Sequence, residues 1–346
     1  MFIQNKVALV SDLHFGVHQG NSVWHNISFE FAKWFKNELK KRKIKDIIIC
    51  GDVNNDRNEI SVHTLSIVTD IFKLWSDFNI KILIGNHDAY YKDRCDVNSL
   101  TQFSGWPNIE IYDDNHVIDQ FDKKFGFVPW SKDISEMPKC DIIFGHFDIS
   151  GFTMVRGKIC ADGIKSYDVL KKADLIVSGH FHMKDERKYE NGTILYLGCP
   201  YELSWNDYNV QKGIYLLDLE TNKTEFIENT FSPKHKKIFL SELLTQGKMT
   251  KTLKEEIKGN IVKFIIDKEI KSDKIETLVG KLSTFQPLIF NTEFDTHTNY
   301  ISDDISLETA GVDILTTIHE FIDMLEIKNK ENVIFHMDQL YKRIVS

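Results

Sequence analysis

The stretch DLIVSGHFH, residues 174–182, passes from a run of aliphatic residues through a glycine into a pair of histidines. The aliphatic run is continuous rather than alternating, which is typical of a strand that is covered on both faces. Amphipathic segments at helical spacing, such as residues 28–43 and 61–78, separate several runs of this kind. The other runs are KVALVSD (6–12), KDIIICGD (45–52), IKILIGN (80–86) and CDIIFGH (140–146). Strands and helices that alternate in this way predict an α/β fold.

Each of these strands ends on side chains that can bind a metal ion. The donors, in chain order, are Asp12, His14, Asp52, Asn86, His146, His180 and His182. Ligands of open α/β sheets bind beyond the carboxyl ends of the strands, so we expect these side chains to meet at one edge. His180 and His182 should point to the same side, while Phe181 points into the core.

A glycine comes directly before Asp52, Asn86, His146 and His180. A chain that turns sharply out of a sheet often needs a positive φ or a close backbone approach at such a position, and glycine permits both.

Seven donors are more than one ion uses, and the set mixes imidazole with oxygen. It predicts a two-metal site about 3.5–4 Å across in which one carboxylate is shared. Such donors without a thiolate favour Mn²⁺, Fe²⁺ or Zn²⁺ over Ca²⁺ or Mg²⁺. Purely structural strand ends are the alternative. The ordered series D-x-H, G-D, G-N-H-D, G-H and G-H-x-H favours the metal site.

Composition excludes several classes of protein. The formal charge of −8 argues against a protein that coats nucleic acid through general basicity. The five cysteines contain no C-x-x-C pair, which favours a reducing compartment. No basic leader and no apolar run of about 20 residues is present, so we expect a cytoplasmic protein with no membrane segment.

Residues 1–230 resemble the calcineurin-like metallophosphoesterases, and within them the SbcD-type repair nucleases and the nuclease subunit of the phage recombination endonuclease. The resemblance rests on SDLHFGV (11–17), GNHDAYY (85–91), VPW (128–130), SGHFH (178–182) and YLGCPYELSWND (196–207). It implies a four-layer αββα sandwich with mixed sheets, a small α+β capping domain and C-terminal helices.

The resemblance also implies roles for the donors. Asp12, His14 and His182 would hold one ion, and Asn86, His146 and His180 the other, with Asp52 as the bridge. His87 would match the catalytic histidine, and Mn²⁺ would be the expected ion. Many relatives carry His or Asp three residues after the bridging carboxylate. Asn55 stands there and is a candidate phosphate contact, so activity could be lowered or redirected.

The remainder of the chain changes character. Residues 260–267, 272–285 and 287–295 predict a strand, a helix and a strand, within an α+β capping or DNA-positioning domain at 231–302. Residues 303–346 contain two helical stripes: Leu315, Ile318, Ile322 and Leu325, then Val333, Met337, Leu340 and Ile344. These stripes either pack as ordinary core or, as the resemblance implies, bind the coiled coil of a partner.

The resemblance implies a Mn²⁺-dependent DNA nuclease, a double-strand exonuclease with single-strand endonuclease activity. The resemblance implies an SbcC-like coiled-coil ATPase as partner, double-stranded DNA ends as substrate, and a homodimer. For the dimer, the apolar face of Leu65, Val68 and Phe72 is the candidate surface. The rival hypotheses are another phosphoesterase of this fold, acting on nucleotides or phosphoproteins, and a non-catalytic binding module.

Overall fold

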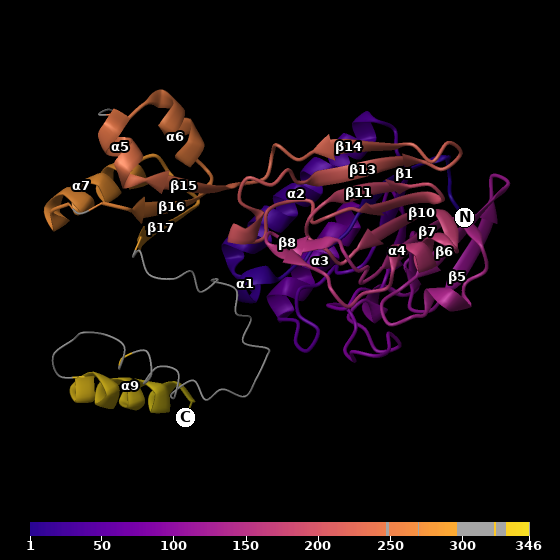
Figure 1. The fold of residues 1–346 in the computed structure, drawn as a ribbon, viewed down its shortest axis with the longest axis horizontal. Helices are drawn as coiled ribbons and strands as arrows, with labels where there is room; N and C mark the ends of the chain where they lie inside the picture. The colour runs from indigo at the N-terminus through magenta and orange to yellow at the C-terminus, as the bar shows by residue number, and fades with distance from the viewer. Residues whose placement is uncertain (247–248, 269, 296–321, 323–329, 346) are drawn as a thin grey trace. The chain divides into compact units, whose positions relative to one another are not determined.

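Two six-stranded mixed sheets form the first part of the chain (Figure 1). The computed structural model describes residues 1–246, 249–268, 270–295, 322 and 330–345. The first sheet has the order β14-β13-β1-β2-β3-β4, and the second has the order β11-β12-β10-β7-β6-β5. The strands of the first sheet are β1 (Lys6–Val10), β2 (Asp46–Ile49), β3 (Asn79–Leu83), β4 (Ile109–Tyr112), β13 (Gly213–Asp218) and β14 (Thr224–Glu228). Those of the second are β5 (His116–Gln120), β6 (Lys123–Val128), β7 (Cys140–His146), β10 (Ala173–Gly179), β11 (Asp185–Tyr189) and β12 (Gly192–Tyr196).

The two sheets face each other across an apolar layer. Leu9 and Ile48 of the first sheet belong to one buried cluster with Phe144 and Val177 of the second. The outer face of the first sheet packs against α2 (Ser22–Lys41) and α3 (Val62–Leu74). The outer face of the second is covered by the short α4 (Ser166–Leu170) and by residues 147–164, which are loops around the short hairpin of β8 (Thr153–Val155) and β9 (Lys158–Ile159). The predicted α/β architecture of mixed sheets and helices is therefore confirmed, although the outer layer on this second side contains little helix.

Helix α2 begins earlier than the hydrophobic pattern predicted. The side chain of Asn21 accepts a hydrogen bond from Val23 N, which satisfies one backbone donor of the first turn. From there Trp24, Phe31 and Phe35 are buried along one face, at the spacing that a helix packed on a sheet requires.

Two of the three residues of the apolar face predicted for a homodimer, Val68 and Phe72, belong to the core instead, while Leu65 is half-buried. Val68 and Phe72 of α3 are completely buried against α2 and the first sheet. A helix stripe that faces a sheet has the same sequence spacing as one that faces a second subunit, so the pattern alone did not distinguish them. These two side chains are unavailable to a partner copy.

Residues 235–294 form a smaller module around a three-stranded parallel sheet. Its elements are β15 (His235–Phe239), α5 (Leu240–Gln246), α6 (Lys251–Ile257), β16 (Ile261–Ile266), α7 (Ser272–Ser283) and β17 (Ile289–Phe294). The predicted strand, helix and strand correspond to β16, α7 and β17. The module joins the larger part through Glu202, whose Oε2 accepts a hydrogen bond from His235 N at 2.6 Å.

Residues 296–346 form a separate unit. In it, α9 (Lys330–Val345) contains the second predicted stripe, with Val333 and Met337 half-buried. Three residues of the first stripe, Leu315, Ile318 and Leu325, lie outside the described residues.

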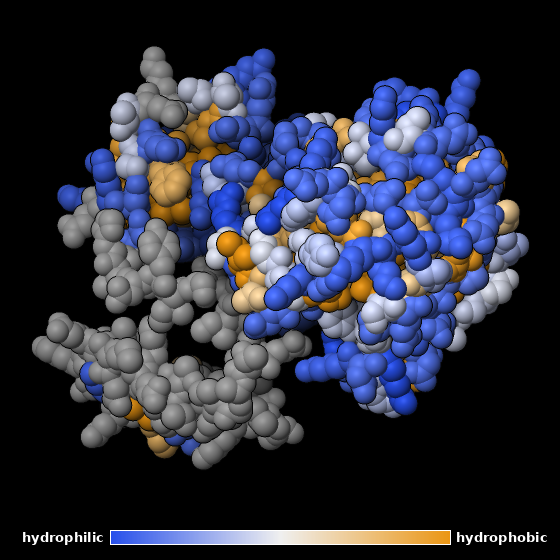
Figure 2. Space-filling model, turned by 45° about the vertical axis from the view of Figure 1, so that its right-hand side comes forward, coloured by the Kyte–Doolittle hydropathy of each residue, from blue (hydrophilic) through white to orange (hydrophobic). Residues whose placement is uncertain are grey.

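Several shorter elements complete the described chain. They are α1 (Val17–Gly20), the 3₁₀ turns η1 (Thr101–Phe103), η2 (Ile134–Glu136) and η3 (Trp205–Asp207), and the hairpin of β8 (Thr153–Val155) and β9 (Lys158–Ile159). The face seen in Figure 2 is mostly hydrophilic, as the charge composition leads one to expect. Within the described part of the chain, no helix has the length and apolar character needed to cross a bilayer.

Candidate metal centre

The predicted donors come from both sheets. Asp12, Asp52 and Asn86 follow β1, β2 and β3, which are parallel neighbours in the first sheet. His146 ends β7, and His180 with His182 follows β10, its parallel neighbour in the second sheet. Parallel strands end at the same edge, so the two sheets bring their carboxyl ends to one crevice.

The backbone adopts the left-handed region at four of the predicted donors. Asp12, His14, Asp52 and His180 all have positive φ, at 53°, 45°, 56° and 83°. Non-glycine residues adopt this region at a cost and concentrate at functional sites.

The glycines before the donors permit a close approach of backbone and side chain. A Cβ on Gly85 would lie 2.1 Å from Asp52 Oδ1, and one on Gly51 would lie 2.4 Å from His146 Nδ1. Gly51 also has a φ of +92°. Any larger residue would therefore displace a donor.

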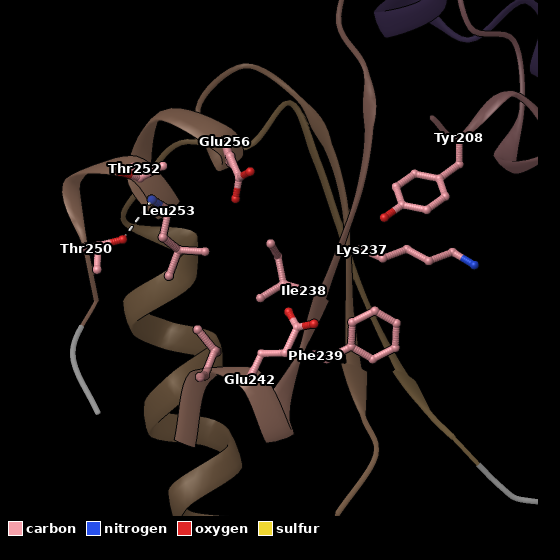
Figure 3. Close-up of a pocket in the computed structure, with 10 residues that line it drawn as sticks. Tyr208, Lys237, Ile238, Phe239, Glu242, Thr250, Thr252, Leu253 and Glu256 are labelled. Carbon is pink, nitrogen blue, oxygen red and sulfur yellow. Dashed lines mark hydrogen bonds between the residues drawn. The ribbon is translucent and has the colours of Figure 1, made fainter. Parts of the chain in front are cut away.

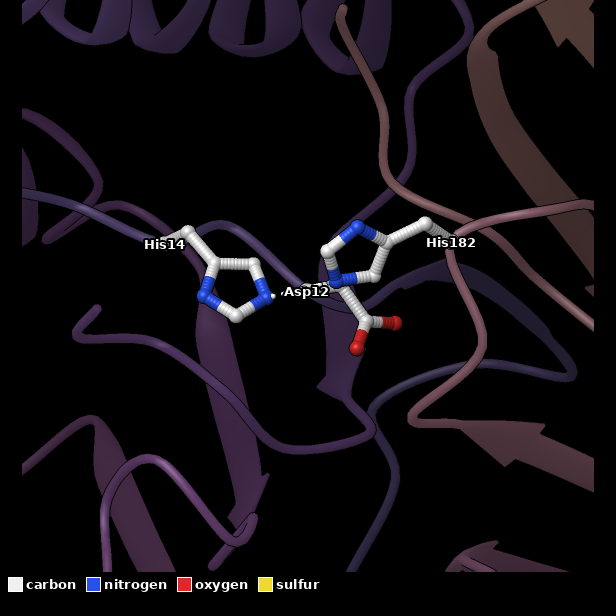
Figure 4. Close-up of side chains that lie close together, drawn as sticks. All are labelled: Asp12, His14 and His182. Atoms are coloured by element: carbon white, nitrogen blue, oxygen red, sulfur yellow. Dashed lines mark hydrogen bonds between the residues drawn. The ribbon is translucent and has the colours of Figure 1, made fainter. Parts of the chain in front are cut away.

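One group of donors comprises Asp12, His14 and His182 (Figure 4). The Nε2 atoms of the two histidines face each other at 3.0 Å. Burial, followed by the neighbouring His182, lowers the pKa of His14 well below its usual range, and burial lowers the pKa of His182 to about 4. Both rings are thus neutral near pH 7 and present lone pairs.

A second group comprises Asn86, His146 and His180. Asn86 Oδ1 lies 2.9 Å from His146 Nε2 and 2.8 Å from His180 Nδ1. His146 Nδ1 lies 2.7 Å from the carbonyl oxygen of Cys50, which can only accept, so Nδ1 carries the proton and Nε2 faces the crevice.

Asp52 lies between the two groups. Its Oδ2 is 3.3 Å from His146 Nε2 and 3.8 Å from His14 Nε2. Burial would raise the pKa of Asp52, but the adjacent His146 outweighs burial and holds it well below the usual range. The carboxylate is therefore ionised and accessible to both groups.

His87 and Asn55 are half-buried beside the two donor groups. His87 donates its backbone N–H to Asp52 Oδ1 at 2.8 Å, and its ring packs edge-to-face on His14 with centroids 4.8 Å apart. His87 Nδ1 is 2.6 Å from the carbonyl oxygen of Asn55. The contact of Asn55 with His87 is therefore made by the Asn55 backbone carbonyl. It engages Nδ1 of His87 and leaves Nε2 outside this bond.

Divalent cations fit this arrangement. Asp12 Oδ2 is buried and has no hydrogen-bond partner among the described residues. Burial raises the pKa of Asp12 to about 7, which marks a carboxylate that lacks compensating positive charge. Imidazoles, an amide oxygen and two carboxylates, with no thiolate, are a donor set suited to Mn²⁺, Fe²⁺ or Zn²⁺.

Three carboxylates that the motif analysis did not select support the centre. Asp148 Oδ1 lies 2.9 Å from His180 Nε2, which orients that ring. The buried Asp88 accepts hydrogen bonds from the backbone N–H groups of Asn54 and Gly85, tying together the loops after β2 and β3. Both residues stand inside the motifs GHFD and GNHD, so their spacing was a usable signal.

The third carboxylate belongs to a buried ion pair behind His182. Lys212 Nζ is 2.5 Å from Asp207 Oδ1 and 2.8 Å from the carbonyl oxygen of His182. Asp207 is the last residue of the segment YLGCPYELSWND quoted above, but nothing in the sequence pointed to Lys212 or to the pairing of the two residues.

A separate pocket lies at the smaller module (Figure 3). It measures about 490 Å³ and is lined by residues that include Tyr208, Lys237, Phe239, Glu242 and Glu256. None of the predicted metal donors lines this pocket, so it is separate from the candidate metal centre.

Comparison with known proteins identifies the family. The sequence profile described as calcineurin-like phosphoesterase matches residues 5–184, more than half of the chain. The chain belongs to this family. The calcineurin-like phosphoesterase segment contains every strand that carries a donor, and membership supports a hydrolase that acts on phosphoester bonds.

A relative matches nearly the whole chain. Exonuclease subunit 1 of Enterobacteria phage T4 is 25% identical over 359 residues, covering 97% of this chain and 98% of the relative. Among solved structures, an archaeal phosphodiesterase is 16% identical, with a TM-score of 0.35, and covers 65% of this chain and 99% of its own. A dimetal phosphatase from Danio rerio is 12% identical, with a TM-score of 0.42, and covers 64% of this chain and 95% of its own. These two structural likenesses concern the fold alone.

Proposed function

We propose that the protein is a DNA nuclease that depends on two divalent ions, with Mn²⁺ as the native metal. The observation that carries the proposal is the convergence of two donor groups on one shared carboxylate, Asp52, in a chain similar over its whole length to a phage exonuclease subunit. The reaction is hydrolysis of DNA phosphodiester bonds, as a double-strand exonuclease and a single-strand endonuclease.

In this proposal Asp12, His14 and His182 hold one ion, and Asn86, His146 and His180 hold the other. Asp52 contacts both. When bound, the ions would supply Lewis-acid chemistry, acidifying a water molecule and neutralising the phosphate oxygens. Five of the donors, Asp12, His14, Asp52, Asn86 and His146, are buried, and the surrounding packing holds their side chains in place, while His180 and His182 are half-buried.

His87 is proposed as the general acid, or as a cation that contacts the phosphate. The carbonyl oxygen of Asn55 holds the Nδ1 proton, so that Nε2 is the atom that delivers a proton to the departing 3′-oxygen. The Asn55 side chain, in place of the usual His or Asp, is proposed as a phosphate contact.

The partner proposed is an SbcC-like coiled-coil ATPase, contacted by residues 303–346, while residues 231–302 act as a capping domain that positions DNA ends. A homodimer would need a surface other than Val68 and Phe72, because these are buried in the core. The proposed setting is the cytoplasm of a bacterial cell or of a phage-infected host.

Three substrates separate the proposal from its rivals. The purified chain with Mn²⁺ should digest linear duplex DNA, and the Asp52→Ala variant should not. Hydrolysis confined to mononucleotides or bis(p-nitrophenyl) phosphate would favour another phosphoesterase of this fold. A chain that binds DNA but hydrolyses none of the three substrates would favour the binding module.

A further inference from the structure

Two exposed tyrosines follow the metal ligand Asn86 within five residues. Tyr90 is 49% exposed and Tyr91 is 39% exposed, and both belong to the loop after β3. Their rings meet edge-to-face, with centroids 4.9 Å apart. The guanidinium carbon of Arg94 lies 4.0 Å from the centroid of the Tyr91 ring. Together they present an aromatic surface with a cation on one side.

The loop that carries the tyrosines is held by hydrogen bonds. Tyr90 N donates to Val97 O at 3.0 Å, which closes the loop on itself. Trp130 Nε1 donates to Lys92 O at 3.1 Å, and Cys95 Sγ donates to Trp130 O at 2.7 Å. The tyrosine rings are therefore presented from a fixed backbone.

The same contacts place the loop beside the metal centre. The ring of Trp130, which bonds to the loop, lies 5.1 Å from the ring of His180. Tyr90 follows His87 by three residues, so their Cα atoms lie no more than about 11 Å apart. The two residues are therefore separated by no more than about three nucleotide steps of a stacked strand, at roughly 3.4 Å each.

The chemistry of the loop suits a base better than a phosphate backbone. Lys92 and Arg94 are balanced by Asp93 and Asp96, and Arg94 forms an ion pair with Asp96 at 3.3 Å. The loop thus provides little net field for a duplex backbone, whereas exposed aromatic rings stack on the face of any unpaired base. A guanidinium beside such a ring adds to this attraction.

We propose that Tyr90 and Tyr91 form a stacking platform for an unpaired nucleobase at the end of a DNA strand. The inference rests on the proposed nuclease function and names the form of its substrate: a strand end whose terminal base has left the duplex. The scissile phosphate lies at the metal centre while the platform holds the base.

The test measures base stacking directly. An oligonucleotide with an unpaired terminal 2-aminopurine is titrated with the full chain in EDTA, without the ions that the proposed hydrolysis requires, and the quenching of its fluorescence reports stacking. The wild-type chain should quench it. The double variant Tyr90→Leu/Tyr91→Leu, which keeps apolar bulk without a ring, should bind this end roughly 5- to 150-fold more weakly.

Two controls isolate the ring. The double variant Tyr90→Phe/Tyr91→Phe should quench and bind as the wild type does, because stacking needs no hydroxyl. Tyr167→Leu should change nothing. Tyr167 is also exposed and also has a cation over its ring. It lies on α4, which precedes the amino end of β10, whereas His180 and His182 follow the carboxyl end of that strand.

Hydrolysis of bis(p-nitrophenyl) phosphate, which has no base to stack, should be equal in all variants. A Leu double variant that binds and quenches as the wild type does overturns the platform. Phe variants that are as defective as the Leu variants also overturn it, because the hydroxyls and not the rings would then matter. If the wild-type chain hydrolyses the aryl ester but neither binds nor cleaves DNA, the proposed nuclease function fails, and this inference fails with it.

Discussion

Replacing Lys212 with methionine tests how the buried ion pair supports the metal centre. Lys212 is only 5% exposed, and its Nζ contacts Asp207, the carbonyl oxygen of His182 and, at 2.9 Å, Cys199 Sγ. Methionine has nearly the volume of the lysine side chain, so the substitution preserves packing but leaves Asp207 buried without its cation. Breaking a buried pair from one side costs about 3–5 kcal/mol.

That cost is large beside a total stability of about 5–15 kcal/mol for a folded domain. At about 2–4 °C per kcal/mol, Lys212→Met should lower Tm by roughly 6–20 °C, measured by calorimetry in the metal-free state. The matched control is Lys132→Met, which removes a cation 3.0 Å from Asp114 Oδ1 at the surface, where the two side chains are 30% and 73% exposed. The control should cost no more than about 1 kcal/mol.

The pH dependence provides a second measurement on the same variant. Burial would raise the pKa of Asp207, but Lys212 and then His182 outweigh burial and hold it below its ordinary value. A carboxyl whose folded pKa is depressed contributes stability that is complete above its unfolded pKa of about 3.9 and is lost as pH falls through the folded pKa. In Lys212→Met this part of the acid dependence should shrink. A variant as stable as Lys132→Met, with an unchanged acid profile, would refute the assignment.

Three further outcomes follow from the site. Asp148→Asn should weaken the ion at His180 by about 10- to 100-fold while the other ion binds normally, which a calorimetric Mn²⁺ titration would resolve; equal loss at both sites would contradict the local role of Asp148. His87→Ala should keep metal binding and lower turnover by about 10²- to 10⁴-fold, and loss of the metal as well would make His87 a ligand. Deleting residues 307–346 should leave aryl ester hydrolysis intact and abolish co-purification with the ATPase, whereas a truncated chain that aggregates would mean that these helices are core.

The strands, and the side chains that meet beyond their ends, could be predicted because both follow from local sequence. A strand buried on both faces needs a continuous aliphatic run, and a donor that follows such a run falls at a sheet edge whatever the rest of the chain does. Asp12, Asp52 and Asn86 illustrate this rule. What local sequence did not reveal is that the donors divide between two facing sheets.

The supporting contacts could not be predicted because they depend on tertiary packing. Lys212 meets His182 across 30 residues of sequence, and Trp130 meets His180 across 50, with no periodicity that marks either residue. Val68 and Phe72 were wrongly predicted as part of a dimer surface for a related reason. Val68 and Phe72 have the same spacing whether they face a sheet or a second subunit, and only the packing of α2 and the first sheet decides between them.

Counting bound ions tests the central claim most directly. The purified full chain is titrated with Mn²⁺ by calorimetry, and digestion of linear duplex DNA is followed over the same range of metal concentration. The wild-type chain should bind two ions per chain and cleave DNA only when both sites are filled, whereas Asp52→Ala should lose both high-affinity ions and all cleavage. A stoichiometry of one ion with full cleavage, or cleavage retained by Asp52→Ala, would contradict the account.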